Sequence, residues 1–448
     1  MIIRWQSVEA SQPFTGWGLA HFSARFGAKD LPAPCRRGGQ SHFRGPRREN
    51  RDSPRERLRG IAFLKRSCGV AGITVGPSMT RQAIFEASVR YFLEPIRGLL
   101  EDDSVTEIMV NGPEEIYIER QGRLEYTGLR FPSEDALRSA VNNVAQWVGR
   151  EITDEHPVLD ARLPNGSRVH AIIPPSARGG TYLTIRKFSQ AALTLDDFVR
   201  LGSISPAAVE FLELCVRMRK NILISGGTGT GKTALLGALS RAIPDSERIV
   251  VIEDTSELRL QQPHCLYLEA RHAAPSGRGA LTVRDLFRNS LRMRPDRIIV
   301  GEVRGGEALD LVQSMISGHS GSLSTIHAQT PADALTRLET LSLMSGLDLP
   351  VYVARAQVAS AIQVAVQIAR FSEDGSRKVT RITEVCGLDE ANRYRLVDLF
   401  VNQLRGKTAD GRLIAELVSS GQKPSFAREP YEQGLDDRIR LTGPLWSK

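Results

Sequence analysis

The stretch NILISGGTGTGKTALLGALSRAI, residues 221–243, decides the fold of this chain. Its first residues form a short apolar run typical of a buried strand, and the residues after Thr233 have the leucine spacing of a helix. Between them, the loop 226–233 matches the pattern G-x-x-x-x-G-K-[ST]. Glycines in such a loop let successive backbone N–H groups face one phosphate chain, and the helix N-terminus adds the positive end of its dipole.

This arrangement predicts a nucleotide site in which Lys232 contacts the β- and γ-phosphates and the Thr233 hydroxyl binds Mg²⁺. The predicted nucleotide-binding residues form one continuous segment: Gly226, Gly227, Thr228, Gly229, Thr230, Gly231, Lys232, Thr233 and Ala234.

Carboxylates follow two further apolar strands. RIVVIED ends with Glu253 and Asp254, and RIIVGEV contains Glu302 at the end of its apolar run. Open parallel sheets place their sites at the carboxyl ends of strands, and phosphoryl transfer needs acids for the metal ion and for the attacking water. Each acid alone could be an ordinary surface residue, but acids at two strand ends in a chain with a phosphate loop favour a catalytic role. His319 and His327 fall in GHSGSLSTIHA, and the residues alone do not distinguish a functional histidine from a structural one.

Strand-like and helix-like segments alternate from Asn221 onward, which predicts a parallel α/β sheet covered by helices on both faces. We expect a smaller α+β domain at 79–190, a linker with an entry helix at 191–218, the α/β domain at 219–405 and a weakly ordered tail at 406–448. Val353–Phe371 contains many apolar residues interrupted by polar ones, and we interpret it as a core helix.

Charge is distributed unevenly along the chain. Residues 1–78 contain 14 Arg and Lys against 5 Asp and Glu, whereas the remainder contains 45 basic and 46 acidic residues. The basic segment lacks apolar periodicity, which predicts disorder. It could be a tail that contacts anionic lipid or nucleic acid, or a solvated linker, or translation could begin at Met79. The balanced charge of the remainder gives no reason to expect nucleic-acid binding.

Cysteine content and hydropathy exclude several classes of protein. Five scattered cysteines with no C-x-x-C pair indicate reduced thiols rather than a disulfide framework or a zinc site. No run of about 18 apolar residues is present, and the N-terminus lacks the apolar core of a secretory signal. These observations favour a cytoplasmic protein without a spanning helix.

Four phrases together resemble the Walker A, Asp, Walker B and His boxes of type II and type IV secretion ATPases. They are SGGTGTGKT, VVIEDTSELRLQQPH, RNSLRMRPDRIIVGEVRGGEA and SGHSGSLSTIHAQTPADALTRLE, in that order along the chain. The N-terminal phrases EIMVNGPEEIYIERQGRL, DARLPNGSRVHAIIPP and LTIRKF are similar to the CpaF branch, the assembly ATPases of Flp-type pili, and less closely to the conjugal-transfer ATPase TrbB. The resemblance extends from about residue 81 to about 346, and more loosely to about 400.

The resemblance implies a RecA-like P-loop ATPase domain, a hexameric ring at the cytoplasmic face of the bacterial inner membrane, and inner-membrane platform proteins as partners. It implies hydrolysis of ATP with Mg²⁺ to drive pilin assembly or substrate export. In that family Glu253 corresponds to the candidate general base, and Glu302 to the Walker B acid that binds Mg²⁺ through water or polarises the attacking water. His327 corresponds to a γ-phosphate sensor and His319 to a second, less certain position. The nucleotide-capping arginines correspond to Arg168 and Arg186. Ala234 departs from the family, which usually has a second threonine there.

Three other functions remain open at this point. A conjugal-transfer ATPase would contain the same boxes. A nucleic-acid motor with the same core would need a basic strand channel, which the neutral charge of residues 79–448 disfavours. A non-enzymatic nucleotide-binding regulator would be expected to lack one of the four site residues Lys232, Thr233, Glu253 and Glu302, all of which are present.

Overall fold

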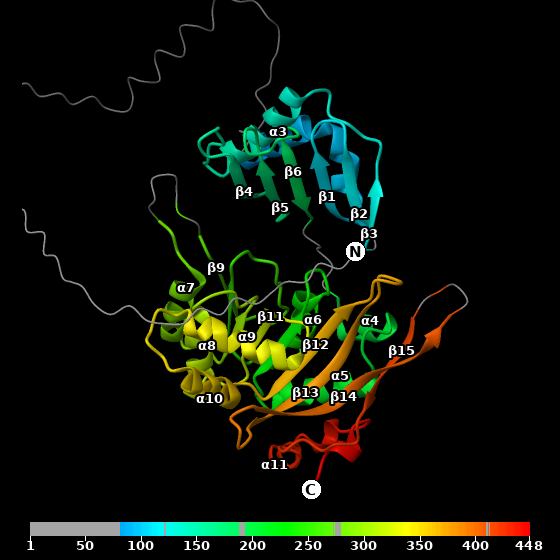
Figure 1. Ribbon diagram of the computed structural model, residues 1–448, viewed down its shortest axis with the longest axis vertical. Coiled ribbons are helices and arrows are strands. Elements are labelled where there is room, and N and C mark those ends of the chain that lie inside the picture. Colours follow the sequence, from blue (N-terminus) through cyan, green and yellow to red (C-terminus); the bar gives the residue numbers. More distant parts are fainter. Residues whose placement is uncertain are drawn as a thin grey trace, which may run out of the picture. The chain divides into compact units, whose positions relative to one another are not determined.

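The computed structural model describes residues 81–120, 122–187, 193–271, 273, 279–408, 411 and 413–448. The basic segment 1–78 and the question of a start at Met79 therefore lie outside the described residues. The described residues contain two β-sheets, one of six strands and one of nine (Figure 1). The first belongs to the N-terminal part of the chain and the second to the part that contains the phosphate loop.

The six-stranded sheet is antiparallel and has the order β3-β2-β1-β6-β5-β4. Its strands are β1 (Val105–Asn111), β2 (Ile116–Arg120), β3 (Arg123–Tyr126), β4 (Val158–Arg162), β5 (Arg168–Ile172) and β6 (Tyr182–Arg186). The helices of this part are α1 (Arg81–Phe92), η1 (Glu94–Ile96), α2 (Arg97–Glu101) and α3 (Glu134–Trp147). Helix α3 begins where the Ser133 hydroxyl accepts the N–H of Ala136. This α+β architecture is the one expected from the sequence.

The register of the N-terminal sheet aligns three arginines. Arg162 of β4 lies opposite Arg168 of β5, and Arg168 lies opposite Arg186 of β6. Directly opposed residues share one face of a sheet and have Cβ atoms about 5 Å apart, so like charges in these positions repel one another. We call these three residues the arginine row. Glu107 of β1 lies opposite Arg186 and supplies one anion within the sheet, whereas Arg168 has an arginine opposite it on both sides.

The nine-stranded sheet has the order β15-β14-β13-β12-β7-β11-β10-β8-β9. The six strands from β12 to β9 are parallel, as expected for a RecA-like domain, and three antiparallel strands extend the sheet beyond β12. Its strands are β7 (Ile222–Gly226), β8 (Ile249–Glu253), β9 (Cys265–Glu269), β10 (Arg297–Val300), β11 (Leu323–His327), β12 (Val364–Arg370), β13 (Arg377–Leu388), β14 (Tyr394–Lys407) and β15 (Leu413–Ser419).

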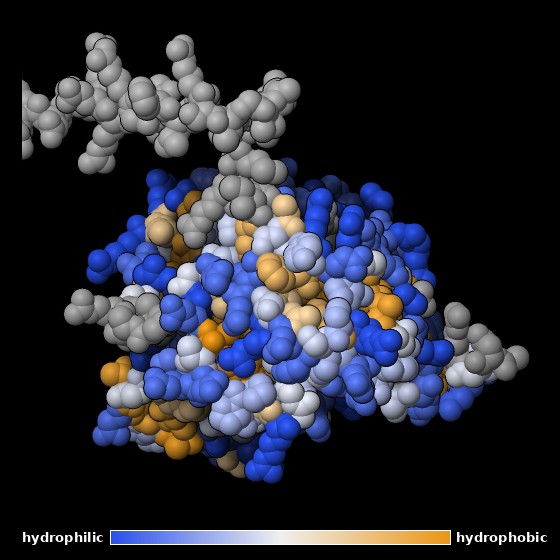
Figure 2. All heavy atoms as spheres, turned by 90° about the horizontal axis from the view of Figure 1, so that it is seen from above, coloured by the Kyte–Doolittle hydropathy of each residue, from blue (hydrophilic) through white to orange (hydrophobic). Residues whose placement is uncertain are grey.

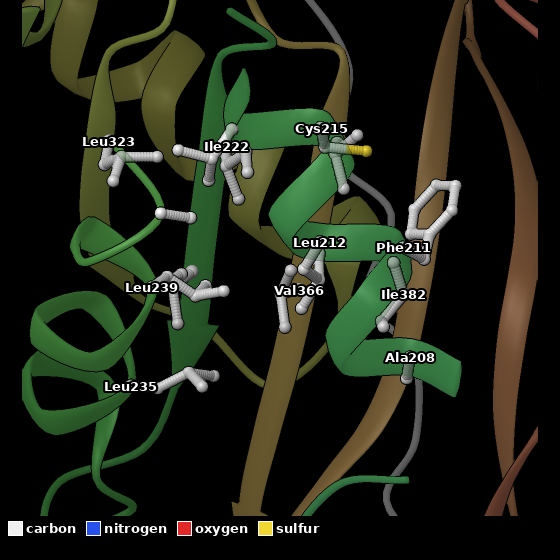
Figure 3. Close-up of a cluster of buried hydrophobic side chains, with 14 of the residues drawn as sticks. Ala208, Phe211, Leu212, Cys215, Ile222, Leu235, Leu239, Leu323, Val366 and Ile382 are labelled. Atoms are coloured by element: carbon white, nitrogen blue, oxygen red, sulfur yellow. The ribbon is translucent and has the colours of Figure 1, made fainter. Parts of the chain in front are cut away.

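Helices cover both faces of this sheet. Alternate residues of each strand point to opposite faces, so Ile222 and Ile224 of β7 join one buried cluster while Leu223 joins the other. The first cluster contains residues of α4 (Leu195–Arg200), α5 (Pro206–Arg217) and α6 (Lys232–Ser240), and part of it is shown in Figure 3. The second contains residues of α7 (Val283–Ser290), α8 (Glu307–Ile316), α9 (Pro331–Leu343) and α10 (Val351–Ala361). Burial on both faces explains why the strands are almost entirely apolar.

The helix expected over residues 353–371 is wrong in its second half. Helix α10 ends at Ala361, and β12 begins at Val364 and pairs in parallel with β7. A central strand that is buried on both faces forms a continuous apolar run, which periodicity alone does not separate from a buried helix. The β-branched Val364, Val366 and Ile368 are the local signal for the strand.

The C-terminal residues differ from the weakly ordered tail expected from 406 onward. Strand β14 continues to Lys407 and pairs with β15, and a short helix α11 (Glu429–Glu432) follows. Trp446 is 3% exposed, and its ring stacks on Phe211 of α5 with centroids 5.4 Å apart. After Ser419 the apolar residues are few and widely spaced, so they leave no periodic signal in the sequence.

Replacing Trp446 by alanine is expected to destabilise the domain by about 3–5 kcal/mol, because it removes a buried aromatic side chain and leaves a cavity against α5. The indole N–H also donates to the Thr442 hydroxyl at 2.8 Å. Chemical denaturation followed by circular dichroism measures the change. Leu441→Ala is the matched control, since Leu441 is 57% exposed and its loss should change stability by no more than about 0.5 kcal/mol. Equal stability of the two variants would contradict this account of the C-terminal segment.

Three observations concern the surface and the thiols of the described residues. Within the described ranges, no helix is long and apolar enough to cross a membrane. On the face shown in Figure 2, hydrophobic residues occur in separate patches among hydrophilic ones. Cys215, Cys265 and Cys386 are free thiols, while Cys35 and Cys68 lie outside the described residues.

Candidate active site

A cavity of about 370 Å³ lies at the carboxyl ends of the central parallel strands. It is lined by most of the site residues predicted from the sequence, including the catalytic candidates Lys232, His327 and Glu302. Its lining residues are Gly166, Arg168, Arg186, Lys187, Leu193, Thr228, Gly229, Gly231, Lys232, Thr233, Ala234, Gly237, Ser256, Glu257, Leu258, Arg259, Glu302, Arg304 and His327. A smaller hollow of about 40 Å³ shares Thr233 and Glu302 with it and adds Glu253 and Asp254.

The phosphate loop is shaped by its glycines and by the neighbouring strand β12. A Cβ on Gly226 would lie 2.4 Å from the Ile368 carbonyl oxygen, so only glycine fits there. Gly229 and Gly231 have φ angles of 68° and 95°, which glycine adopts without steric cost. Gly226, Gly227 and Thr230 form the base of the loop rather than the cavity wall. The Thr230 hydroxyl donates to the Gly227 carbonyl at 3.0 Å.

Lys232 folds back over its own loop. Its Nζ donates to the Gly227 carbonyl oxygen at 2.9 Å and lies 3.4 Å from Nε2 of His327. Burial lowers the pKa of Lys232, and the nearby Glu302 carboxylate opposes that change. Burial also lowers the pKa of His327, and Lys232 lowers it further, so the neutral imidazole is favoured at pH 7. A neutral ring beside the lysine leaves the ammonium free to bind an anion.

Glu302 connects His327 to Arg304. Its Oε2 accepts Nε–H of Arg304 at 2.8 Å, and its Oε1 lies 3.0 Å from Nε2 of His327. Oε1 is buried and forms no hydrogen bond with the described residues. Arg304 also lies 3.6 Å from Asp254. Glu302 therefore has one carboxylate oxygen without a hydrogen bond among the described residues.

The residues present fit a magnesium ion that arrives with a phosphate ligand. Glu302 Oε1 is an unpartnered carboxylate oxygen, and the Thr233 hydroxyl borders the same small hollow. The described part of the chain contains no group of three or more His, Cys, Asp or Glu side chains that could hold a metal by themselves. Mg²⁺ commonly keeps several waters and uses one or two protein oxygens plus substrate phosphates, which matches this sparse set of ligands.

Glu253 is buried at the end of β8, with 4% of its surface exposed. Its Oε1 accepts backbone N–H groups of Glu257 at 2.9 Å and Leu258 at 3.0 Å. A Cβ on Gly301 would lie 2.8 Å from Glu253 Cγ, so the glycine before Glu302 makes room for this side chain. Burial raises the pKa of Glu253 to about 7, although the two N–H groups act in the opposite direction. A carboxylate with this pKa suits a general base at neutral pH.

We expect the kcat/KM for nucleotide hydrolysis to fall below about pH 7. The pKa of Glu253 is raised, so its carboxyl group is protonated below that pH and ionised above it, and only the ionised form accepts a proton. A pH profile from acidic to mildly alkaline conditions measures this ascending limb. The Glu253→Gln variant should be weakly active at every pH and should lack the limb. If that variant retained the same inflection, the limb would belong to another group.

Arg168 and Arg186 reach the cavity from the N-terminal sheet. Both guanidinium groups lie near one oxygen, Glu257 Oε1, with Nη1 of Arg168 at 3.4 Å and Nη1 of Arg186 at 3.6 Å. Arg162, the third member of the arginine row, instead contacts the Ser256 carbonyl and Glu269, whose Oε2 lies 3.2 Å away. Arg162 does not line the cavity, whereas the other two arginines do.

Three residues of this site were not predicted from the sequence. Glu257 lies in the Asp box and Arg304 in the Walker B box, so their membership of these boxes is the only feature of the sequence that could have indicated a role. Arg377 of β13 donates from Nε to the Gly229 carbonyl of the phosphate loop at 2.7 Å. The two residues are far apart in the sequence, so nothing in the sequence indicates this contact. His319, the less certain histidine, does not line the cavity, and its Nδ1 is buried without a partner in the described residues.

The sequence model of the family described as "Type II/IV secretion system protein" matches residues 92–418, which includes both sheets and the whole cavity. The chain belongs to the type II/IV secretion system protein family. This confirms the resemblance at family level, while the assignment to the CpaF branch stays a prediction.

Other members of the type II/IV secretion family align with most of the chain. It is 37% identical over 335 residues to a putative conjugal transfer protein of Mycobacterium tuberculosis, covering 73% of this chain and 92% of that protein. It is 38% identical over 322 residues to the type IV secretion system protein PtlH of Bordetella pertussis, covering 65% and 94%. The crystal structure of the VirB11 ATPase from Brucella suis in complex with sulphate matches with 32% identity and a TM-score of 0.36, covering 66% and 97%.

Proposed function

We propose that this chain is an Mg²⁺-dependent ATPase that acts as the motor of a bacterial secretion or pilus-assembly system. One observation carries the proposal: the phosphate-loop lysine, Glu302 and two arginines of a different sheet all line one cavity. Lys232, Arg168 and Arg186 supply the positive charge that a triphosphate requires, and Glu302 with Thr233 would hold the metal ion. Membership of the type II/IV secretion system protein family supports this activity.

The mechanism is in-line transfer of the γ-phosphoryl group to water. Glu253 holds the attacking water and accepts its proton, since its carboxylate is fixed by two backbone N–H groups at the strand end. The loop N–H groups, Lys232 and the two arginines stabilise the negative charge that spreads over the phosphoryl oxygens. When bound, Mg²⁺ neutralises part of the charge on the β- and γ-phosphates.

Motion would follow from the placement of the cations on separate sheets. Lys232 belongs to the central sheet and Arg168 and Arg186 to the N-terminal sheet, so a γ-phosphate bridges the two parts of the chain. Hydrolysis and phosphate release remove that anion and leave the two arginines with the weaker contacts to Glu257, which favours opening. The work stroke is therefore the opening and closing of the N-terminal part over the nucleotide.

Steady-state phosphate release tests the proposal. The purified full chain should release phosphate from ATP with Mg²⁺ and lose that activity when a chelator is added. No release above background would overturn it in favour of a nucleotide-binding regulator. Adding single-stranded DNA should leave the rate unchanged, and strong stimulation would instead support a nucleic-acid motor.

The transport system is a separate part of the proposal. We infer a ring, a hexamer in the family resemblance, attached to platform proteins at the inner face of the inner membrane. Flp-type pilus assembly rests on the N-terminal phrases, and conjugal transfer is the second candidate because the Mycobacterium tuberculosis relative has that name. Deleting the gene and measuring surface pilin and plasmid transfer side by side distinguishes the two systems, and sedimentation with a non-hydrolysable ATP analogue tests the ring.

A further inference from the structure

Glu257 occupies a special position in the cavity. Its side chain is the shared partner of Arg168 and Arg186, and its backbone N–H holds Glu253, the proposed base. No role for it follows from the hydrolysis mechanism, since it would place a negative charge near the triphosphate. We therefore infer that Glu257 acts in the state without bound nucleotide.

The contacts of Glu257 with the arginines are long. The distances of 3.4 and 3.6 Å exceed the roughly 2.7–2.9 Å of a tight charge-assisted hydrogen bond, and both arginines use the same carboxylate oxygen. The side chain is about one quarter exposed, so solvent weakens the attraction further. The two arginines therefore form an anion-binding site in which the Glu257 carboxylate is bound only weakly. A γ-phosphate has more charge and three oxygens, so it binds the same two guanidinium groups more strongly.

We propose that Glu257 is a displaceable counter-ion that keeps Arg168 and Arg186 paired and directed at the cavity until the γ-phosphate of ATP takes its place. The inference rests on the ATPase function proposed above and adds a regulatory step to the same site. The arginine row explains the need for such a group, because Arg168 is opposed by an arginine on each side, while the acidic Glu107 lies opposite Arg186 alone.

Competition with the carboxylate has a measurable consequence. When the arginines are partly occupied by Glu257, the apparent affinity for a triphosphate is reduced by the fraction of protein in which they are free. Exposed ion pairs contribute little, so the reduction should be about two- to tenfold for the pair of contacts. Diphosphate binding should change less, because ADP lacks the γ-phosphate that replaces the carboxylate.

Glu257→Gln tests the proposal, with binding of a non-hydrolysable ATP analogue and of ADP measured by calorimetry on the full chain. The variant keeps the backbone N–H to Glu253 but removes a negative charge that helps to raise the pKa of Glu253, so the ascending limb of the pH profile should move to lower pH. We expect about two- to tenfold tighter binding of the ATP analogue and little change for ADP. In an Arg168→Gln/Arg186→Gln background, the same substitution should have no effect on affinity for the analogue.

Glu269→Gln is the matched control. It removes a carboxylate from a contact of the same kind, with Arg162, outside the cavity lining. That variant should bind the analogue as the unmodified protein does. Unchanged or weaker binding by the Glu257→Gln protein, or an equal gain in the double-arginine background, would overturn the counter-ion role. If the unmodified protein bound no ATP analogue at all, the proposed ATPase function itself would fail, and the two failures are thus distinguishable.

Discussion

Lys232→Ala is expected to abolish ATP hydrolysis while the protein remains folded. The ammonium group stabilises charge on the β- and γ-phosphates, and removing one such electrostatic contact in an active site costs about 10²–10³ in kcat. The fold should persist because, among the described residues, the Lys232 ammonium has polar contacts only with the Gly227 carbonyl and His327, and alanine is favourable in the first turn of α6. Phosphate release and thermal denaturation measure the two effects.

Lys423→Ala serves as the control for this experiment. Lys423 is exposed, donates to the Ser447 hydroxyl and lies outside the cavity lining, so its loss should leave the rate unchanged. Normal turnover in the Lys232→Ala protein would refute the assignment of the phosphate loop as the catalytic site. A collapse of the fold in that variant would show that the lysine contacts are structural.

Replacing Arg168 or Arg186 by glutamine is expected to lower kcat by about 10³-fold or more. A guanidinium that meets the transferred phosphoryl group in the transition state is worth about 10³–10⁵ in rate. Both side chains are at least one third exposed, and their contacts with Glu257 are loose, so stability should change little. Single-turnover hydrolysis separates the chemical step from nucleotide binding.

Arg162→Gln is the matched control, because Arg162 lies in the same cross-strand row and contacts the same loop without lining the cavity. We expect it to retain most of its kcat. A loss of the same size in all three variants would indicate that the row acts only to hold the two sheets together. A rise in KM with unchanged kcat in the Arg168 and Arg186 variants would indicate ground-state binding alone.

The centre of the fold was predictable because its signals are local. The apolar strand, glycine loop and helix around Lys232 are consecutive in the chain, and Glu253 and Glu302 each end a continuous apolar run. Parallel strands bring such ends to one edge of a sheet, so the convergence of these residues follows from the pattern. The helix cap at Ser133 is likewise encoded within four residues.

The other features of the fold and of the site depend on contacts between residues that are distant in the sequence. Nothing near Arg377 indicates that it donates to Gly229, and nothing near Trp446 indicates that it stacks on Phe211. The strand at Val364 was read as helix because burial on both faces removes the two-residue alternation. In the same way, Glu257 falls within a conspicuous phrase, but its role depends on two arginines that lie in strands of the other sheet.

The antiparallel register of β5 and β6 limits which insertions and deletions the sequence of this enzyme can tolerate. Slippage of either strand by a single position would transfer its arginine to the opposite side of the sheet, because neighbouring residues project in opposite directions. The phosphate loop would be unchanged, but the protein would lose its ATPase activity. Length changes in this region are therefore tolerable only within the turns, where they leave the pairing of the two strands untouched.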